Sequence, residues 1–159
     1  QQMKKTNSFM HDFVQHLQDL GLVDTDRYPA RGCNQEQITE IENKFQITLP
    51  QIYKDYLTAI GQKSGDFLRG SDFWYPELLT LREDAEILLQ EDNSPFKLPD
   101  KAFVFGMHQG YQFFYFDTLA GDDPPVYHYM EGEAVKKVND HYSEFLIDML
   151  SDEIEVRES

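Results

Sequence analysis

The segment from Arg31 to Gly61 constrains the fold most, because it contains two short amphipathic helices joined by a tight link. Asn34 can cap the first helix, and Gln37, three residues later, completes the pattern of a capping box. Pro50 suits the first turn of the second helix, where its missing N–H group costs no hydrogen bond. Gly61 is placed to end that helix in the left-handed conformation. Each helix has one apolar face, formed by Ile38, Ile41 and Phe45 in the first and by Ile52, Tyr53, Tyr56, Leu57 and Ile60 in the second.

Further helices and one irregular segment flank this pair. An apolar stripe predicts an N-terminal helix over residues 6–20. Residues 62–70 contain two glycines and indicate a loop with a short strand inside it. Residues 72–79 are aromatic and suggest an irregular edge strand limited by a proline. Thr80 and Glu83 then form a second capping-box pattern before another short helix.

The second half of the chain has the alternation of β-strands. Strands are expected at 102–107, 111–116, 126–130 and 133–138, with turns at Gln109-Gly110 and Glu131-Gly132. Asn139 or Asp140 is expected to cap a closing helix, whose charged end over residues 151–159 is expected to fray. The order of elements predicts an α+β fold: N-terminal helices, an antiparallel meander of four or more strands, and a closing C-terminal helix.

Length and composition favour one domain spanning residues 1–159. A hydrophobic fraction of 40% and an aromatic fraction of 14% argue against disorder. No apolar run reaches the roughly 20 residues that span a bilayer, and no secretory signal is recognisable. The single cysteine, Cys33, excludes an internal disulfide, suits a reducing compartment and has no neighbouring histidine that would activate it. We therefore expect a cytoplasmic protein that does not bind membranes.

Charge is the strongest compositional signal, with 14 Lys and Arg against 29 Asp and Glu and a net charge of −15. A small domain typically carries a net charge of about 2 to 8 in magnitude. Nucleic acids and anionic membranes are disfavoured as partners, because phosphate binding needs Lys and Arg. A basic protein partner is favoured, since complementary fields accelerate encounter. The alternative is that the charge serves solubility alone.

An ordered set of residues resembles the SUKH superfamily, which contains bacterial immunity proteins and fungal regulators of cell-wall synthesis. The resemblance covers a core of about 31–150, so that residues 6–20 would precede it, and it implies the same α+β fold. Ile60 departs from the Asn that many members carry. The residues that carry the resemblance are Gly32, Ile38, Ile41-Glu42, Phe45, Leu49-Pro50, Tyr53, Tyr56-Leu57, Gly61, Pro99-Asp100, Phe103-Val104-Phe105, Gly110, Phe113 to Asp117, Pro125-Val126-Tyr127 and Ser143 to Leu146.

Motifs for catalysis or cofactor binding are not recognisable in the sequence. His108, Asp117, Asp122, Asp123 and His128 are of metal-binding types, but their spacing matches no zinc motif and no EF-hand. The nucleophile elbow and the glycine-rich phosphate loops also have no counterpart. We therefore expect neither a catalytic residue, a metal nor another cofactor.

The function expected from charge and resemblance is that of a non-enzymatic immunity protein. It would bind and neutralise a cognate toxin, which the resemblance implies is often a nuclease, through an acidic surface. A regulatory hub of the cell-wall type and a small-molecule or metal-binding enzyme are the alternatives. Trp74 and Tyr75 are either core residues or interface anchors. The candidate contact residues are Asp66, Asp72, Trp74, Tyr75, Asp117, Asp122, Asp123 and Glu131.

Overall fold

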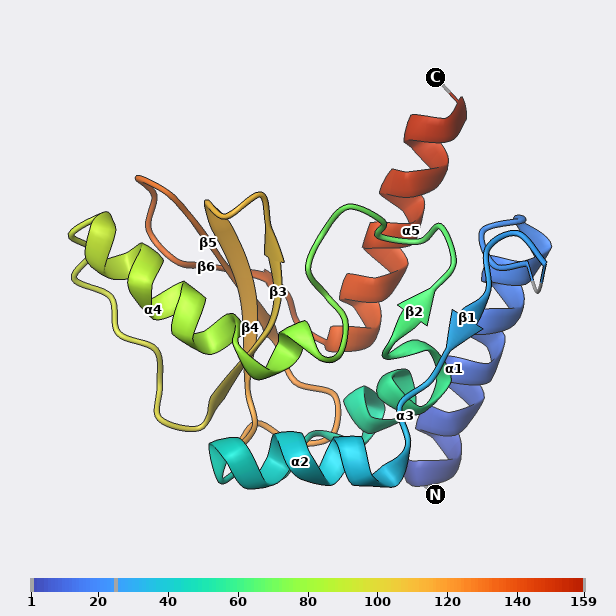
Figure 1. Ribbon diagram of the computed structural model, residues 1–159, viewed down its shortest axis with the longest axis horizontal. Coiled ribbons are helices and arrows are strands. Elements are labelled where there is room, and N and C mark those ends of the chain that lie inside the picture. Colours follow the sequence, from blue (N-terminus) through green and yellow to red (C-terminus); the bar gives the residue numbers. More distant parts are fainter. Residues whose placement is uncertain (1, 25, 159) are drawn as a thin grey trace.

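The computed structural model of the chain describes residues 2–24 and 26–158, which form helices around one antiparallel sheet (Figure 1). The helices are α1 (Gln2–Asp19), α2 (Gln35–Phe45), α3 (Gln51–Ile60), α4 (Leu81–Glu91) and α5 (Tyr142–Glu158), with a short 3₁₀ helix at Glu77–Leu79. The strands are β1 (Ala30–Arg31), β2 (Lys63–Ser64), β3 (Ala102–His108), β4 (Gln112–Asp117), β5 (Val126–Met130) and β6 (Lys136–Asn139). The α+β prediction is confirmed.

The main sheet is a meander in which β3, β4, β5 and β6 are neighbours in chain order, all antiparallel. β1 and β2 form a separate small pair that joins the start of α2 to the end of α3. Figure 1 shows the main sheet between α4 on one side and α5 on the other. β3 and β6 are the two outer strands, and α5 packs against β3 and β4 through Tyr142 and Phe145.

Aromatic side chains fill the core between the sheet, α3 and α5. Tyr53 of α3 lies fully buried, with its ring centroid 5.5 Å from that of Phe103, 5.1 Å from Phe116 and 5.4 Å from Tyr142. Burial of rings of this size supplies most of the driving force for joining helix and sheet. The core therefore fixes where α5 lies relative to the sheet.

The predicted cap of α2 is present. Asn34 Oδ1 accepts a hydrogen bond of 2.8 Å from the backbone N–H of Gln37, and Gln37 Oε1 accepts one of 2.9 Å from the N–H of Asn34. The cap of α3 was predicted wrongly, because Gly61 has φ −65°, a right-handed helical value, and continues the helical turn. Thr80 makes no side-chain cap to α4; its hydroxyl donates instead to the carbonyl of Glu77.

Three other local predictions were wrong. Residues 72–79 form a single bridge, from Asp72 to Met107, followed by a turn and the 3₁₀ helix, and do not form a strand. The strand predicted at 133–138 is β6, which begins only at Lys136. Glu133 still belongs to the turn, because its N–H donates to the carbonyl of Met130. The C-terminal segment is helical to Glu158, because Ile154 packs against the core.

Candidate functional site

The loop before β5 is tied to the start of α5. Asp123 Oδ1 accepts a hydrogen bond of 3.0 Å from the N–H of Ser143, and Asp123 Oδ2 accepts one of 2.6 Å from the Ser143 hydroxyl. His141 Nδ1 donates to the carbonyl of Asp123 at 2.8 Å, and this bond raises the pKa of His141. Asp123 therefore caps α5 in place of Asn139 or Asp140 and sets the position of its first turn.

Replacing Asp123 with alanine is expected to lower the free energy of unfolding by about 1–2 kcal/mol, the usual cost of losing a side-chain helix cap. Urea denaturation would measure the loss. Asp122→Ala is the matched control, because the Asp122 side chain is exposed, and it should change stability by less than about 0.5 kcal/mol. Equal losses in the two variants would show that Asp123 is not the cap.

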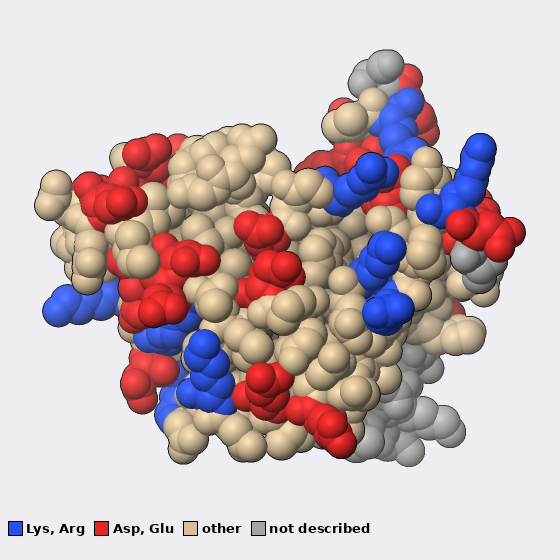
Figure 2. All heavy atoms as spheres, viewed as in Figure 1, with Lys and Arg blue, Asp and Glu red and all other residues tan. Residues whose placement is uncertain are grey.

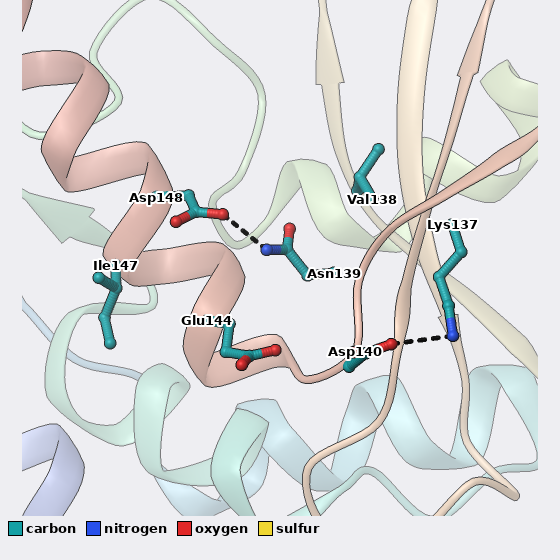
Figure 3. A pocket seen from close by; sticks show the side chains of 7 residues that line it. All are labelled: Lys137, Val138, Asn139, Asp140, Glu144, Ile147 and Asp148. Atoms are coloured by element: carbon teal, nitrogen blue, oxygen red, sulfur yellow. Dashed lines mark hydrogen bonds and ion pairs between the residues drawn. The ribbon is translucent and has the colours of Figure 1, made fainter.

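A shallow depression between β6 and the first turns of α5 combines exposed apolar side chains with carboxylates (Figure 3). We call it the acidic cleft, and its volume is about 340 Å³. Val138 is 42% exposed and Ile147 is 48% exposed, so both present apolar surface to the solvent. The acidic cleft is lined by Lys137, Val138, Asn139, Asp140, Glu144, Ile147 and Asp148.

Side chains in the acidic cleft form short polar contacts, but carboxylates outnumber ammonium groups in its lining. Lys137 Nζ lies 2.9 Å from Asp140 Oδ1, and their hydrogen bond lowers the pKa of Asp140 and raises the pKa of Lys137. Asn139 Nδ2 donates to Asp148 Oδ2 at 2.7 Å. Glu144 is exposed beside them. Three carboxylates thus face one ammonium group in the lining, and the cleft has a negative potential that suits a cationic partner.

A second hollow lies on the other face of the β5–β6 hairpin, where tyrosines gather. We call it the tyrosine groove, with a volume of about 810 Å³. Tyr115 of β4 and Tyr127 of β5 stack across the strands, with ring centroids 5.2 Å apart. The Tyr129 hydroxyl donates to Asp92 Oδ2 at 2.5 Å. The rings that line the groove are those of Phe96, Tyr115, Tyr127 and Tyr129.

Tyr115 and Tyr129 of this groove are neutral hydrogen-bond donors at physiological pH. Burial raises the pKa of Tyr115 to about 12, and burial together with the Asp92 carboxylate raises the pKa of Tyr129 to about 12. Tyrosine combines a large apolar ring with a polar tip, a combination enriched at protein interfaces. The aromatic groove and the acidic cleft thus adjoin each other at Lys137, which lines both.

Residues 32–148 match the sequence profile of the SMI1 / KNR4 family (SUKH-1). The chain belongs to this family. The match spans α2 to α5 and includes both hollows, and it confirms the resemblance seen in the sequence. A search of curated individual proteins finds no match to this SUKH-1 chain.

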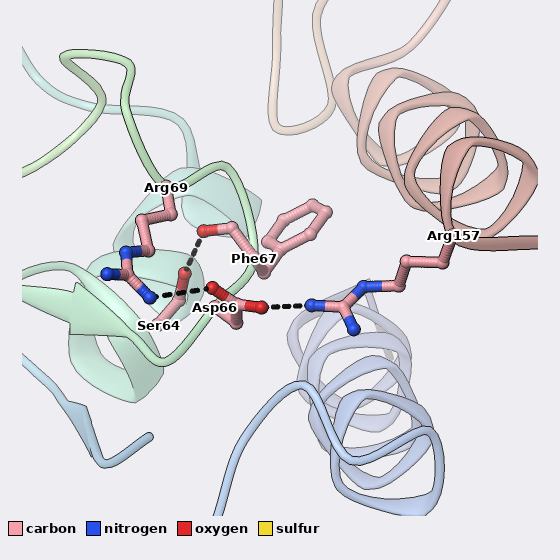
Figure 4. Close-up of polar contacts among 5 residues, drawn as sticks. All are labelled: Ser64, Asp66, Phe67, Arg69 and Arg157. Carbon is pink, nitrogen blue, oxygen red and sulfur yellow. Dashed lines mark hydrogen bonds and ion pairs between the residues drawn. The ribbon is translucent and has the colours of Figure 1, made fainter. Parts of the chain in front are cut away.

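Half of the predicted contact residues of the SUKH-1 chain lie around residues 66–75. Asp66 forms ion pairs with Arg69 and with Arg157 near the end of α5 (Figure 4). The Tyr75 hydroxyl donates to Glu40 Oε1 at 2.5 Å, and Trp74 is half-buried. Asp72 has an exposed side chain, while its backbone pairs with Met107.

The other predicted contact residues lie at the ends of β4, β5 and α5. Asp117 Oδ1 accepts a 2.9 Å hydrogen bond from the N–H of Leu119 and so stabilises the turn after β4. Glu131 is exposed in the turn between β5 and β6. Asp122 and Asp123 precede β5, and Asp123 joins them to α5 beside the acidic cleft. The structure therefore places the eight predicted residues in more than one surface.

Sequence reasoning missed the acidic cleft and the tyrosine groove, although both have a signal in the sequence. Asp140, Glu144 and Asp148 follow each other at intervals of four, the spacing of neighbours on one helix face. Tyr127 and Tyr129 alternate along β5 and therefore point to one face of the sheet. Apolar periodicity indicates which face of a helix is buried, whereas an exposed acidic face becomes recognisable as a site only in the folded structure.

Other kinds of site find little support in residues 2–24 and 26–158. Within these residues no group of three His, Cys, Asp or Glu side chains could hold a metal ion, and no helix is long and apolar enough to cross a membrane. Burial raises the pKa of the Cys33 thiol to about 11, so the reactive thiolate is scarce at neutral pH. Cys33 is accordingly a core side chain.

Proposed function

We propose that this SUKH-1 protein is a cytoplasmic, non-enzymatic binding protein of the immunity type, which neutralises a cognate toxin domain by covering its functional face. The family assignment is compatible with an immunity or a regulatory binding protein. The observation that carries the proposal is the acidic cleft, where exposed Val138 and Ile147 lie among three carboxylates. Apolar centres with charged rims are typical of protein interfaces.

The proposed partner is a basic domain. A nuclease toxin must bind phosphate and therefore has a cationic active face. A protein of net charge −15 can occupy such a face as a substitute for the polyanion, and long-range attraction speeds the encounter. Asp140, Glu144 and Asp148 would pair with lysines or arginines of the toxin, and Val138 and Ile147 would exclude water from the centre of the contact.

Adjoining residues extend the proposed contact surface. Asp122 is exposed in the loop before β5, Glu131 is exposed in the turn after β5, and the tyrosine groove lies along the same strand. Tyr115 and Tyr127 offer stacked rings to a guanidinium group, a favourable cation–π geometry. Asp66, Asp72, Trp74 and Tyr75 remain proposed contacts of a second surface, and Asp117 remains a proposed contact apart from both.

Charge reversal in the acidic cleft tests the proposal. Asp140→Lys/Glu144→Lys should weaken binding to the toxin domain encoded by the neighbouring gene at least about 30-fold, because two attractive contacts become repulsive. Titration calorimetry at several salt concentrations would measure the affinity. Binding to the unchanged protein should also weaken as salt rises, since screening reduces attraction between exposed charges.

Glu83→Lys/Asp84→Lys is the matched control. These two residues are exposed in the first turn of α4, and their reversal changes the net charge of the protein by the same amount. This variant should lose less than about threefold in affinity. Equal losses in both double variants would show that net charge alone matters and that the cleft is not the contact. Turnover of a metabolite with no toxin bound would reject the immunity function.

A further inference from the structure

Lysine and arginine side chains form local groups on this acidic protein. Figure 2 shows one group over the β1–β2 region and beside the C-terminal end of α5, and another in the region of α2 and α4. A pocket of about 540 Å³ lies there, within the usual size range of small-ligand sites. Arg27, Lys63 and Arg69 line it, together with Tyr28 and Trp74. The chain has only 14 lysines and arginines, so three in one pocket lining are a local reversal of the overall charge.

Carboxylates near this pocket already have partners, and one of them is paired with Arg69 of the lining. Among the described residues that line it there is no Asp or Glu. Asp66 lies next to the lining and is held between Arg69 and Arg157 (Figure 4). The Asp24 carboxylate accepts hydrogen bonds from the backbone N–H groups of Asp26 and Arg27, so it faces its own loop. The pocket therefore retains a positive potential that suits an anion.

Trp74 adds a flat aromatic surface to the cationic pocket. Its indole stacks on the buried ring of Tyr56, with centroids 6.3 Å apart and planes 17° apart, and this contact holds it in place. Because Trp74 is half-buried and also lines the pocket, part of the ring remains available to a ligand. Aromatic side chains bind nucleobases by stacking, whereas Arg and Lys bind phosphate oxygens.

We propose that this pocket binds a small nucleoside phosphate, with the base against Trp74 and the phosphate groups between Arg27, Lys63 and Arg69. The site lies on the segment before β1, on β2 and on the loop after β2, apart from the acidic cleft on β6 and α5. Binding there does not involve the acidic cleft, although Trp74 also belongs to the second proposed contact surface. The shared presence of an aromatic ring and three cations selects a nucleotide over an inorganic anion or a free nucleoside.

The single tryptophan of the chain makes the test direct, because all indole fluorescence arises from Trp74. Titration of the purified protein with adenosine diphosphate, without added divalent cation, should quench this fluorescence saturably. Adenosine alone and pyrophosphate alone should each bind at least about tenfold more weakly, because each lacks one of the two recognised parts. Pyrophosphate binding as tightly as the nucleotide would overturn the role assigned to the indole.

Arg27→Gln/Lys63→Gln should weaken nucleotide binding at least about tenfold. Lys97→Gln/Lys136→Gln is the matched control: both residues are exposed, neither lines the pocket, and the change in net charge is the same. The control should bind as the unchanged protein does. Thermal melting would verify that both variants are folded. The proposal would be rejected if millimolar nucleotide caused no saturable quenching, or if the two double variants lost equal affinity. Neither result would bear on toxin binding at the acidic cleft, which is measured separately.

Discussion

Gly32→Ala is expected to destabilise the protein by about 3 kcal/mol or more, a loss large enough to require a backbone clash or a comparable defect. A Cβ at position 32 would lie 1.7 Å from the carbonyl oxygen of Thr58 and 2.6 Å from its carbonyl carbon. Both are backbone atoms of α3, so no side chain can rotate to make room. A hydrogen bond of 2.7 Å from the N–H of Cys33 to the carbonyl of Leu57 holds the two segments together. Urea denaturation would measure the loss.

Gly132→Ala is the control for the Gly32 prediction. Gly132 has φ +81°, but no atom lies within 4 Å of a Cβ built there. Its replacement should therefore cost only the left-handed strain of about 1–2 kcal/mol. A loss at position 32 no larger than that at 132 would show that the approach of the two backbones can relax. The expected difference gives a physical reason for the glycine that opens the family motif.

The helices and strands were predictable because their signals are local. Ile41 and Tyr53 lie on the apolar faces read from helical spacing, and both are fully buried. The turn at Gln109-Gly110 was likewise predictable, and both residues have positive φ. In each case the residues that determine the element lie within a few positions of one another. Such short-range patterns survive in the folded structure because the core uses the same apolar faces.

Caps and helix ends were less predictable, since their partners come from elsewhere in the chain. Asp123 caps α5 from a loop 20 residues before Ser143. The last turns of α5 persist because Ile154 reaches the core and Arg157 reaches Asp66, 91 residues away in sequence. A sequence window of one helix contains neither contact. The acidic cleft is likewise not visible in the sequence, because it forms only when β6 and α5 lie side by side in the fold.

Surface charge is the part of the candidate site that composition describes least well. A net charge of −15 favours a basic partner but does not locate the contact. Asp66 is an acidic residue in a cationic neighbourhood, and Asp123 is used as a helix cap. Glu144, which is not among the predicted contact residues, lies with exposed Ile147 in the cleft. The pairing of each carboxylate, more than the number of carboxylates, decides which of them are available to a partner.

Phe105→Ala is expected to lower the free energy of unfolding by about 3–5 kcal/mol, the range for removing a buried aromatic ring. Phe105 is 1% exposed and packs against rings of β4 and α5. Its centroid lies 5.2 Å from Phe116 of β4, 5.3 Å from Tyr142 and 5.2 Å from Phe145 of α5. Removing the ring leaves a cavity between the sheet and α5. Urea denaturation followed by circular dichroism would measure the change.

Leu119→Ala is the control for the Phe105 prediction, because Leu119 is 78% exposed and its loss should cost less than about 0.5 kcal/mol.

Toxin affinity measured on the folded fraction of Phe105→Ala is a second measurement. Since Phe105 positions α5 but lies outside the acidic cleft, Phe105→Ala should weaken binding only as far as Asp140 and Glu144 shift with the helix. A loss of binding as large as that of the charge-reversed variant, with stability unchanged, would contradict a purely structural role for Phe105.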